Sequence, residues 1–169
     1  MTIKNISLTP AVFHLPDRVN AIAPIYADNP VVPRGPRLAP ILARVQQKLR
    51  ESIGCQNTHD PVMLTCSGSG AIAAALGSCV RSKDPTRSPR ILVISNGAYG
   101  ERQARYANQI GLSTTHYALN YGERPDLAEV ERLATENDVA AIGLVHGATS
   151  TCSVDPTAEF ASIAKQLEP

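Results

Sequence analysis

Residues 62–76 read VMLTCSGSGAIAAAL: an apolar run breaks into small residues and continues as an alanine-rich segment. This order predicts a buried strand, a tight turn at residues 66–70 and the first turns of a helix. A helix start carries unpaired backbone N–H groups and a partial positive charge, and small residues let a phosphate approach those donors closely. The pattern therefore predicts a phosphate site for a cofactor or substrate, although many Gly/Ser turns hold no ligand.

The same turn also fits a dinucleotide fingerprint, G-x-G-x-x-A, at Gly68, Gly70 and Ala73. That fingerprint needs an acidic residue about 20 positions further on, at the end of the next strand, to bind a ribose. The next predicted strand, residues 91–95, runs instead into Asn96. A dinucleotide-binding domain is therefore the lesser alternative.

Length and composition place the chain among ordinary globular proteins. Its 169 residues can bury a core as one domain, with 43% hydrophobic and 18% charged residues. The formal net charge is +1, so composition points to no nucleic-acid partner and no membrane partner. The first residues lack the pattern of a secretory signal, and no segment approaches the roughly 18 apolar residues of a membrane span. We therefore expect a cytoplasmic protein.

Cysteines and histidines give no sign of a metal site. They are Cys55, Cys66, Cys79, Cys152, His14, His59, His116 and His146. Neither kind shows the short ligand spacings of zinc sites, and no C-x-x-C motif occurs. We expect reduced thiols and no bound metal.

The distribution of prolines predicts two regions. Residues 1–37 are predicted to form an extended N-terminal arm, because each proline removes a backbone donor and disfavours helix in the residue before it. The prolines of this arm are Pro10, Pro16, Pro24, Pro30, Pro33 and Pro36. Residues 38–169 are expected to form the domain. It opens with apolar residues at helical spacing, which predict an amphipathic packing helix that ends near Gly54.

Strand-like and helix-like segments alternate after the glycine-rich turn. The predicted strands are residues 91–95, 114–119 and 139–145, and the predicted helices between them are residues 101–110 and 126–135. A last helix is predicted from Asp155 and Pro156, with the aspartate as its N-cap. This order predicts an α/β fold, a three-layer sandwich with a mostly parallel sheet.

Ligands of such sheets bind at the carboxyl ends of the strands. Three predicted strand ends carry small or polar residues: Ser67-Gly68-Ser69, residues 96–99 and residues 147–151. Because parallel strands present their carboxyl ends at one edge, we expect these three turns to converge on a single ligand.

At these turns the sequence resembles the class V aminotransferases, pyridoxal-phosphate enzymes of fold type I. Within that family it is similar to 2-aminoethylphosphonate–pyruvate transaminase and to alanine–glyoxylate aminotransferase. The matching segments are SGS at 67–69, LGS at 76–78, VISNGAYGER at 93–102, YGERPD at 121–126 and residues 146–156. The likeness runs from about residue 38 onward. It implies the N-terminal part of a fold-type-I large domain over residues 38–169.

The resemblance also implies an activity and a binding site. The activity is transfer of an amino group from a small phosphonate or amino acid to pyruvate or another 2-oxo acid, by a homodimer with pyridoxal 5′-phosphate as cofactor. By the resemblance, Ser67, Gly68 and Ser69 hold the cofactor phosphate, Tyr99 stacks on the pyridine ring and Thr149 lies near the phenolic oxygen. The alternatives are a core or interface aromatic for Tyr99 and a capping threonine for Thr149.

Several positions depart from the family pattern. The family usually has Glu where Ala73 and Ala148 stand and Gly where Cys152 stands. Its Thr-Pro-Gly-Pro near the N-terminus is TPAV here, at residues 9–12. The substrate-side loop is therefore not predicted.

The family's catalytic groups have no counterpart in this sequence. The sequence stops at Pro169, before the family's aspartate that pairs with the pyridinium nitrogen and its Schiff-base lysine, and Lys165 matches no catalytic position. We therefore assign no catalytic residue and expect that this chain alone does not transaminate. The alternative is a non-catalytic, truncated or split fragment that acts only with a partner chain.

Overall fold

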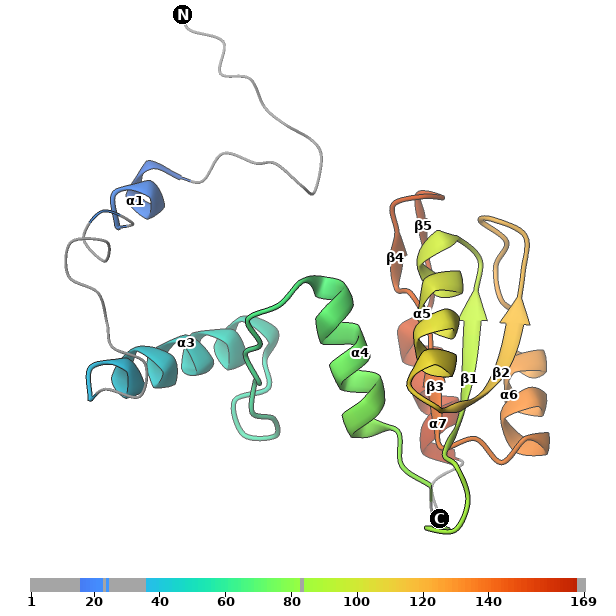
Figure 1. Ribbon diagram of the computed structural model, residues 1–169. Coiled ribbons are helices and arrows are strands. Elements are labelled where there is room, and N and C mark those ends of the chain that lie inside the picture. Colours follow the sequence, from blue (N-terminus) through green and yellow to red (C-terminus); the bar gives the residue numbers. More distant parts are fainter. Residues whose placement is uncertain (1–15, 23, 25–35, 83, 167–169) are drawn as a thin grey trace, which may run out of the picture. The chain divides into compact units, whose positions relative to one another are not determined.

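The computed structural model describes residues 16–22, 24, 36–82 and 84–166 (Figure 1). The chain divides into two compact units, Met1–Met63 and Leu64–Pro169. The predicted boundary between residues 37 and 38 lies inside the first unit. Among the described residues, no helix combines the length and the apolar character needed to cross a bilayer.

The first unit contains helices α1 (Asp17–Asn20) and α3 (Leu38–Ile53). Most of the predicted extended arm, residues 1–15, 23 and 25–35, lies outside the described residues. Its described part contains α1, a helical turn that the prediction of an extended chain missed. Pro16 precedes this turn, and its carbonyl accepts the N–H groups of Val19 and Asn20, because the fixed φ of proline suits a helix start as well as an extended chain.

Helix α3 confirms the predicted amphipathic helix. It ends at Gly54, which adopts the left-handed conformation at φ 69° that glycine tolerates best. Its apolar side chains Leu42, Val45 and Leu49 are 39%, 38% and 43% exposed. The described residues of this unit therefore do not bury this face, although the sequence predicts that it packs.

The strand predicted at the start of the glycine-rich stretch is wrong. Residues 61–64 have no regular structure, and Val62 is 82% exposed. A strand needs a neighbour to pair its backbone N–H and C=O groups. No described strand pairs with this run. Its backbone therefore forms no strand ladder, and its apolar side chains enter no core.

The second unit is built on a parallel sheet in the order β2-β1-β3. Its strands are β1 (Arg90–Ser95), β2 (Ser113–Ala118) and β3 (Ala141–Gly143). The register places Val93 of β1 opposite His116 of β2 and Gly143 of β3. The three strands predicted after the glycine-rich turn are confirmed, although the last is shorter than the predicted residues 139–145 because its ladder with β1 spans only three residue pairs.

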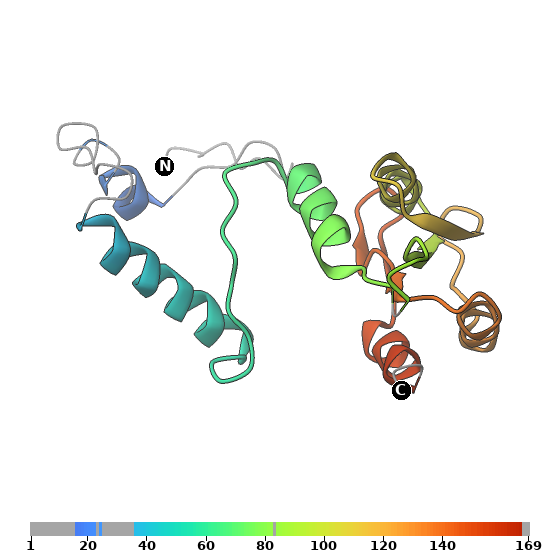
Figure 2. The same ribbon diagram turned by 60° about the horizontal axis from the view of Figure 1, so that its bottom comes forward.

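Helices cover both faces of this sheet (Figures 1 and 2). The helices are α4 (Gly68–Cys79), α5 (Ala98–Gln109), α6 (Leu127–Glu136) and α7 (Thr157–Gln166). One apolar cluster joins Ile91 and Val93 of β1 to α4 and α5. The other joins Leu92 and Ile94 to α6 and α7, with Phe160 only 1% exposed. Alternate side chains of β1 thus enter two cores, which explains its continuous apolar sequence and confirms the three-layer α/β sandwich.

Helix starts follow the local sequence closely. The Ser67 hydroxyl accepts the N–H of Gly70 at 3.2 Å at the start of α4, and the Asp126 carboxylate accepts the N–H of Ala128 at 3.0 Å at the start of α6. The helix predicted over residues 101–110 begins three residues earlier, at Ala98, directly after the turn.

Candidate functional site

The second and third predicted turns meet beyond the carboxyl end of β1. The third turn joins the short antiparallel strands β4 (Gly147–Ala148) and β5 (Ser153–Val154). A Cβ added at Gly97 would lie 3.0 Å from Ser150 Oγ and 3.3 Å from Thr151 Cγ2. A side chain at position 97 would therefore require the Ser150 and Thr151 side chains to move by a few tenths of an ångström.

A buried hydrogen-bond cluster ties the connections together at this edge. Asn96, directly after β1, is 3% exposed, and Asp155, before α7, is 4% exposed. Asn96 Nδ2 donates to both carboxylate oxygens of Asp155, at 3.1 and 3.0 Å, and to the carbonyl of Glu123 at 3.1 Å. The carbonyl of Asn96 accepts the N–H of Gly122 at 2.8 Å. One side chain thereby holds the segments that follow β1, β2 and β5 in fixed positions.

This cluster is not predicted from the sequence, where Asn96 is a turn residue and Asp155 an expected N-cap. In the structure the Asp155 carboxylate faces Asn96, and α7 begins two residues later at Thr157. The two residues are 59 positions apart. An asparagine directly after the strand RILVIS, with its apolar run at residues 91–94, was the available signal, because a buried amide needs partners.

A cavity of about 520 Å³ opens between the start of α4 and α5. Its lining residues are Ser67, Gly68, Ser69, Ile72, Tyr99, Arg102, Gln103 and Tyr106. Four of the five predicted cofactor-binding residues therefore line one cavity. Thr149 does not line it; this residue is exposed, in the turn between β4 and β5.

The backbone at the start of α4 is open to a ligand. The N–H groups of Gly68 and Ser69 belong to the first turn, where no intrahelical acceptor exists. A Cβ added at Gly68 would meet no atom within 4 Å. Since Ser67 Oγ already accepts the N–H of Gly70, its own hydrogen is free to be donated outward.

The lining of the cavity contains one charged side chain, that of Arg102, among the residues that the structure describes. No described acidic residue and no described lysine lines it, and the N-terminus of α4 adds a partial positive charge. The neighbouring carboxylate of Glu101 accepts the phenolic hydrogen of Tyr121 at 3.1 Å. That hydrogen bond raises the pKa of Tyr121 above its usual value. An anionic group would find hydrogen-bond donors here, and the described lining residues include no carboxylate.

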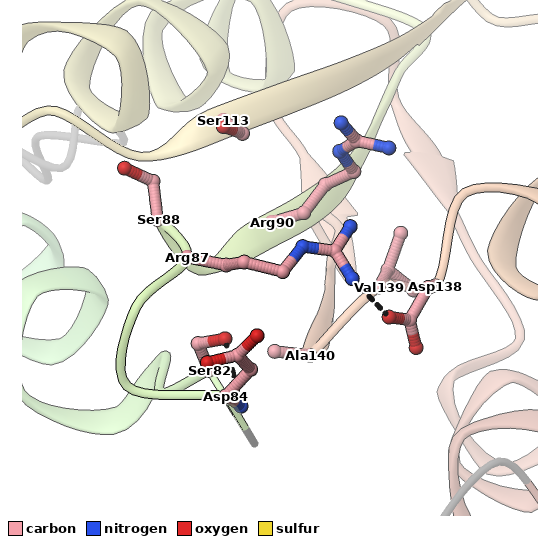
Figure 3. A pocket seen from close by; sticks show the side chains of 9 residues that line it. All are labelled: Ser82, Asp84, Arg87, Ser88, Arg90, Ser113, Asp138, Val139 and Ala140. Carbon is pink, nitrogen blue, oxygen red and sulfur yellow. Dashed lines mark hydrogen bonds and ion pairs between the residues drawn. The ribbon is translucent and has the colours of Figure 1, made fainter.

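A second cavity, of about 280 Å³, lies at the amino ends of the strands (Figure 3). Arg87 and Arg90 line it together with Asp84 and Asp138. Arg87 pairs with Asp138 at 3.4 Å, and Arg90 donates to the carbonyl of Asn137 at 3.0 Å. Hydrogen bonds from Thr86 lower the pKa of Asp84, so its negative charge is retained. The two positive and two negative charges balance. This cavity therefore attracts an anion less strongly than the first cavity does.

The described histidines take hydrogen bonds within the fold. His116 Nε2 lies 2.6 Å from Ser95 Oγ, and His146 Nδ1 lies 2.9 Å from the carbonyl of Asp155. Across residues 16–22, 24, 36–82 and 84–166, no three His, Cys, Asp or Glu side chains gather as metal ligands would. The sequence prediction of no metal site stays a prediction.

Sequence comparison places the chain beside known enzymes. No family model matches it. A 2-aminoethylphosphonate–pyruvate transaminase of Klebsiella pneumoniae is 32% identical over 130 residues, which are 76% of this chain and 34% of that protein. The chain therefore spans about a third of the length of the curated relatives it matches.

Solved structures share the fold. An alanine–glyoxylate aminotransferase from Nostoc sp. matches with a TM-score of 0.69 and 21% identity, over 81% of this chain and 36% of that one. A ureidoglycine–glyoxylate aminotransferase from Bacillus subtilis matches with a TM-score of 0.74 and 19% identity, over 90% of this chain and 37% of that one. At these identities the structures establish the common fold.

Proposed function

Because the chain is a relative of the class V aminotransferases over about a third of their length, we propose that it forms the phosphate- and ring-binding part of a pyridoxal-phosphate site. The observation that carries this proposal is the cavity that Ser67, Gly68, Ser69 and Tyr99 line together. The whole activity would be amino-group transfer from a small phosphonate or amino acid to pyruvate or glyoxylate.

The residues of the cavity fit a phosphorylated aromatic ring. The N–H groups of Gly68 and Ser69 and the hydroxyl of Ser67 would hold phosphate oxygens, and the open space at Gly68 lets them approach the backbone. Tyr99, 41% exposed, would cover one face of the ring. Bound there, the cofactor supplies an electron sink for the amino carbon of the substrate. In this chain, the residues bind and orient the ring and exclude water from one face.

Within the described part of the chain, no lysine lines the cavity. We therefore propose that these residues bind the cofactor and that the covalent and proton-transfer groups come from other segments, of the same protein or of a partner chain. A homodimer, a cytoplasmic location and a role for Thr149 beside the cofactor stay proposals. A dinucleotide-binding domain would need an acidic side chain after β1 to bind the ribose. Asn96 stands there instead, and its amide is hydrogen-bonded to Asp155.

Valine at Gly68 tests the proposed phosphate position. The probe is pyridoxamine 5′-phosphate, because it lacks the aldehyde that would react with any lysine. A Cβ added at Gly68 would meet no atom within 4 Å, and the branched side chain of Gly68→Val would stand where a phosphate must approach the backbone. We therefore expect little change in the free energy of unfolding and a Kd raised about tenfold or more by loss of close phosphate contacts. Isothermal calorimetry and urea denaturation measure the two effects.

The matched control is Gly77→Ala, in the same helix but outside the cavity, where an added Cβ would make only an ordinary 3.8 Å contact with Ile110 Cδ1. This variant should bind as the unmodified chain does. Absence of saturable binding to the unmodified chain, or equal Kd values for both variants, would contradict the proposal.

A further inference from the structure

Arg102 packs against the aromatic ring that is expected to cover the cofactor. Its Cζ lies 5.4 Å from the centroid of the Tyr99 ring, one turn earlier on α5, and both residues line the cavity. A guanidinium at this distance is attracted by the face of the ring. Because Tyr99 is 41% exposed, core packing alone does not fix its ring, and contact with Arg102 restricts the orientations available to it.

Arg102 is also the residue that gives the lining a full positive charge. The backbone donors at the start of α4 provide hydrogen bonds but only a partial charge. None of the other lining residues is an aspartate, glutamate, lysine or arginine; they are Ser67, Gly68, Ser69, Ile72, Tyr99, Gln103 and Tyr106. Arg102 therefore supplies the full positive charge that a dianionic phosphate ester would meet in this lining.

We propose that Arg102 is a positioning residue with two effects: it orients the Tyr99 ring and it selects ligands that combine a flat ring with a phosphate. The inference rests on the proposed function of the same cavity. Arginine suits both effects because its guanidinium is planar, stacks on aromatic faces and keeps N–H donors in a fixed fork for an oxyanion. Lysine would keep the charge and lose the stacking.

The test compares two probes, pyridoxamine 5′-phosphate and unphosphorylated pyridoxamine. For Arg102→Ala we expect the Kd of the phosphorylated probe to rise about tenfold or more, since a charge-assisted contact is lost. The Kd of pyridoxamine should rise less, about threefold, through the less ordered Tyr99 ring. The ratio of the two affinities therefore falls, which a general loss of structure would not produce.

Arg102→Lys separates charge from stacking. This variant should recover most of the preference for the phosphorylated probe but not the affinity for pyridoxamine. Arg105→Ala is the matched control, because Arg105 is exposed on the same helix and does not line the cavity. It should change neither Kd, and all three variants should keep the urea midpoint of the unmodified chain.

The outcomes distinguish this inference from the proposed function. If the unmodified chain binds the phosphorylated probe and Arg102→Ala binds it as tightly as Arg105→Ala does, the role of Arg102 is refuted while the proposed function stands. If Arg102→Ala weakens both probes by the same factor, selection of the phosphate is refuted. If the unmodified chain binds neither probe, both proposals fail together.

Discussion

Alanine at position 100 is expected to destabilise the second unit by about 2 kcal/mol, although alanine favours helices over glycine by about 1 kcal/mol. Gly100 lies in the first turn of α5, where the helix crosses the end of β1. A Cβ added there would lie 2.6 Å from both Cα and Cβ of Ser95 and 3.0 Å from the carbonyl oxygen of Ile94. Backbone atoms cannot rotate away from such contacts, so α5 has to shift off the sheet.

Urea denaturation of Gly100→Ala beside Gly77→Ala measures this effect. Both changes place alanine in a helix, but the nearest atom to a new Cβ at Gly77 is 3.8 Å away. We expect Gly77→Ala to be neutral or to gain about 0.5–1 kcal/mol. Equal stability of the two variants would show that α5 does not approach β1 as closely as described. Because α5 carries Tyr99 and Arg102, Gly100→Ala should also weaken binding of pyridoxamine 5′-phosphate.

Removing the amide of Asn96 is expected to cost about 3 kcal/mol of unfolding free energy. Asn96→Ala deletes the donor to Glu123 and to both oxygens of Asp155. Asp155 is 4% exposed, so water cannot replace the lost donor without opening the turns. A buried polar group that loses its hydrogen-bond donor is among the more destabilising changes known for single residues.

Asn120→Ala is the matched control for Asn96. Its amide Nδ2 also donates to a carboxylate, Glu123 Oε2 at 2.8 Å, but both side chains are exposed. Water replaces the lost hydrogen bond there, and we expect a loss below about 1 kcal/mol. A loss of that size for Asn96→Ala as well would mean that the Asn96–Asp155 contact does not hold the turns together.

Local patterns predicted most of the second unit. Strands 91–95 and 114–119 and the helices over residues 101–110 and 126–135 follow from apolar periodicity and from caps such as Asp126, which depend only on neighbouring residues. The resemblance to class V aminotransferases, drawn from short segments such as NGAYG, is confirmed by the relatives that the chain matches. The same resemblance predicts that Ser67, Gly68, Ser69 and Tyr99 bind one cofactor.

What failed depended on residues distant in sequence. The run at residues 62–65 has the composition of a strand, but pairing decides whether a strand forms, and no described strand pairs with it. The Asn96–Asp155 contact joins residues that only the folded sheet brings together. From the sequence, Arg102 cannot be told from a charged residue on an exposed helix face. Only the structure shows its contact with the Tyr99 ring.

The position of the bound phosphate tests the central claim most directly. The measurement is a titration of the ¹⁵N-labelled chain with pyridoxamine 5′-phosphate, followed through its backbone amide resonances. We predict saturable shifts of the amides of Gly68, Ser69 and Gly70, accompanied by those of Tyr99 and Arg102. Unchanged resonances at these amides, or saturable shifts confined to Arg87 and Arg90 at the opposite end of the strands, would contradict the account.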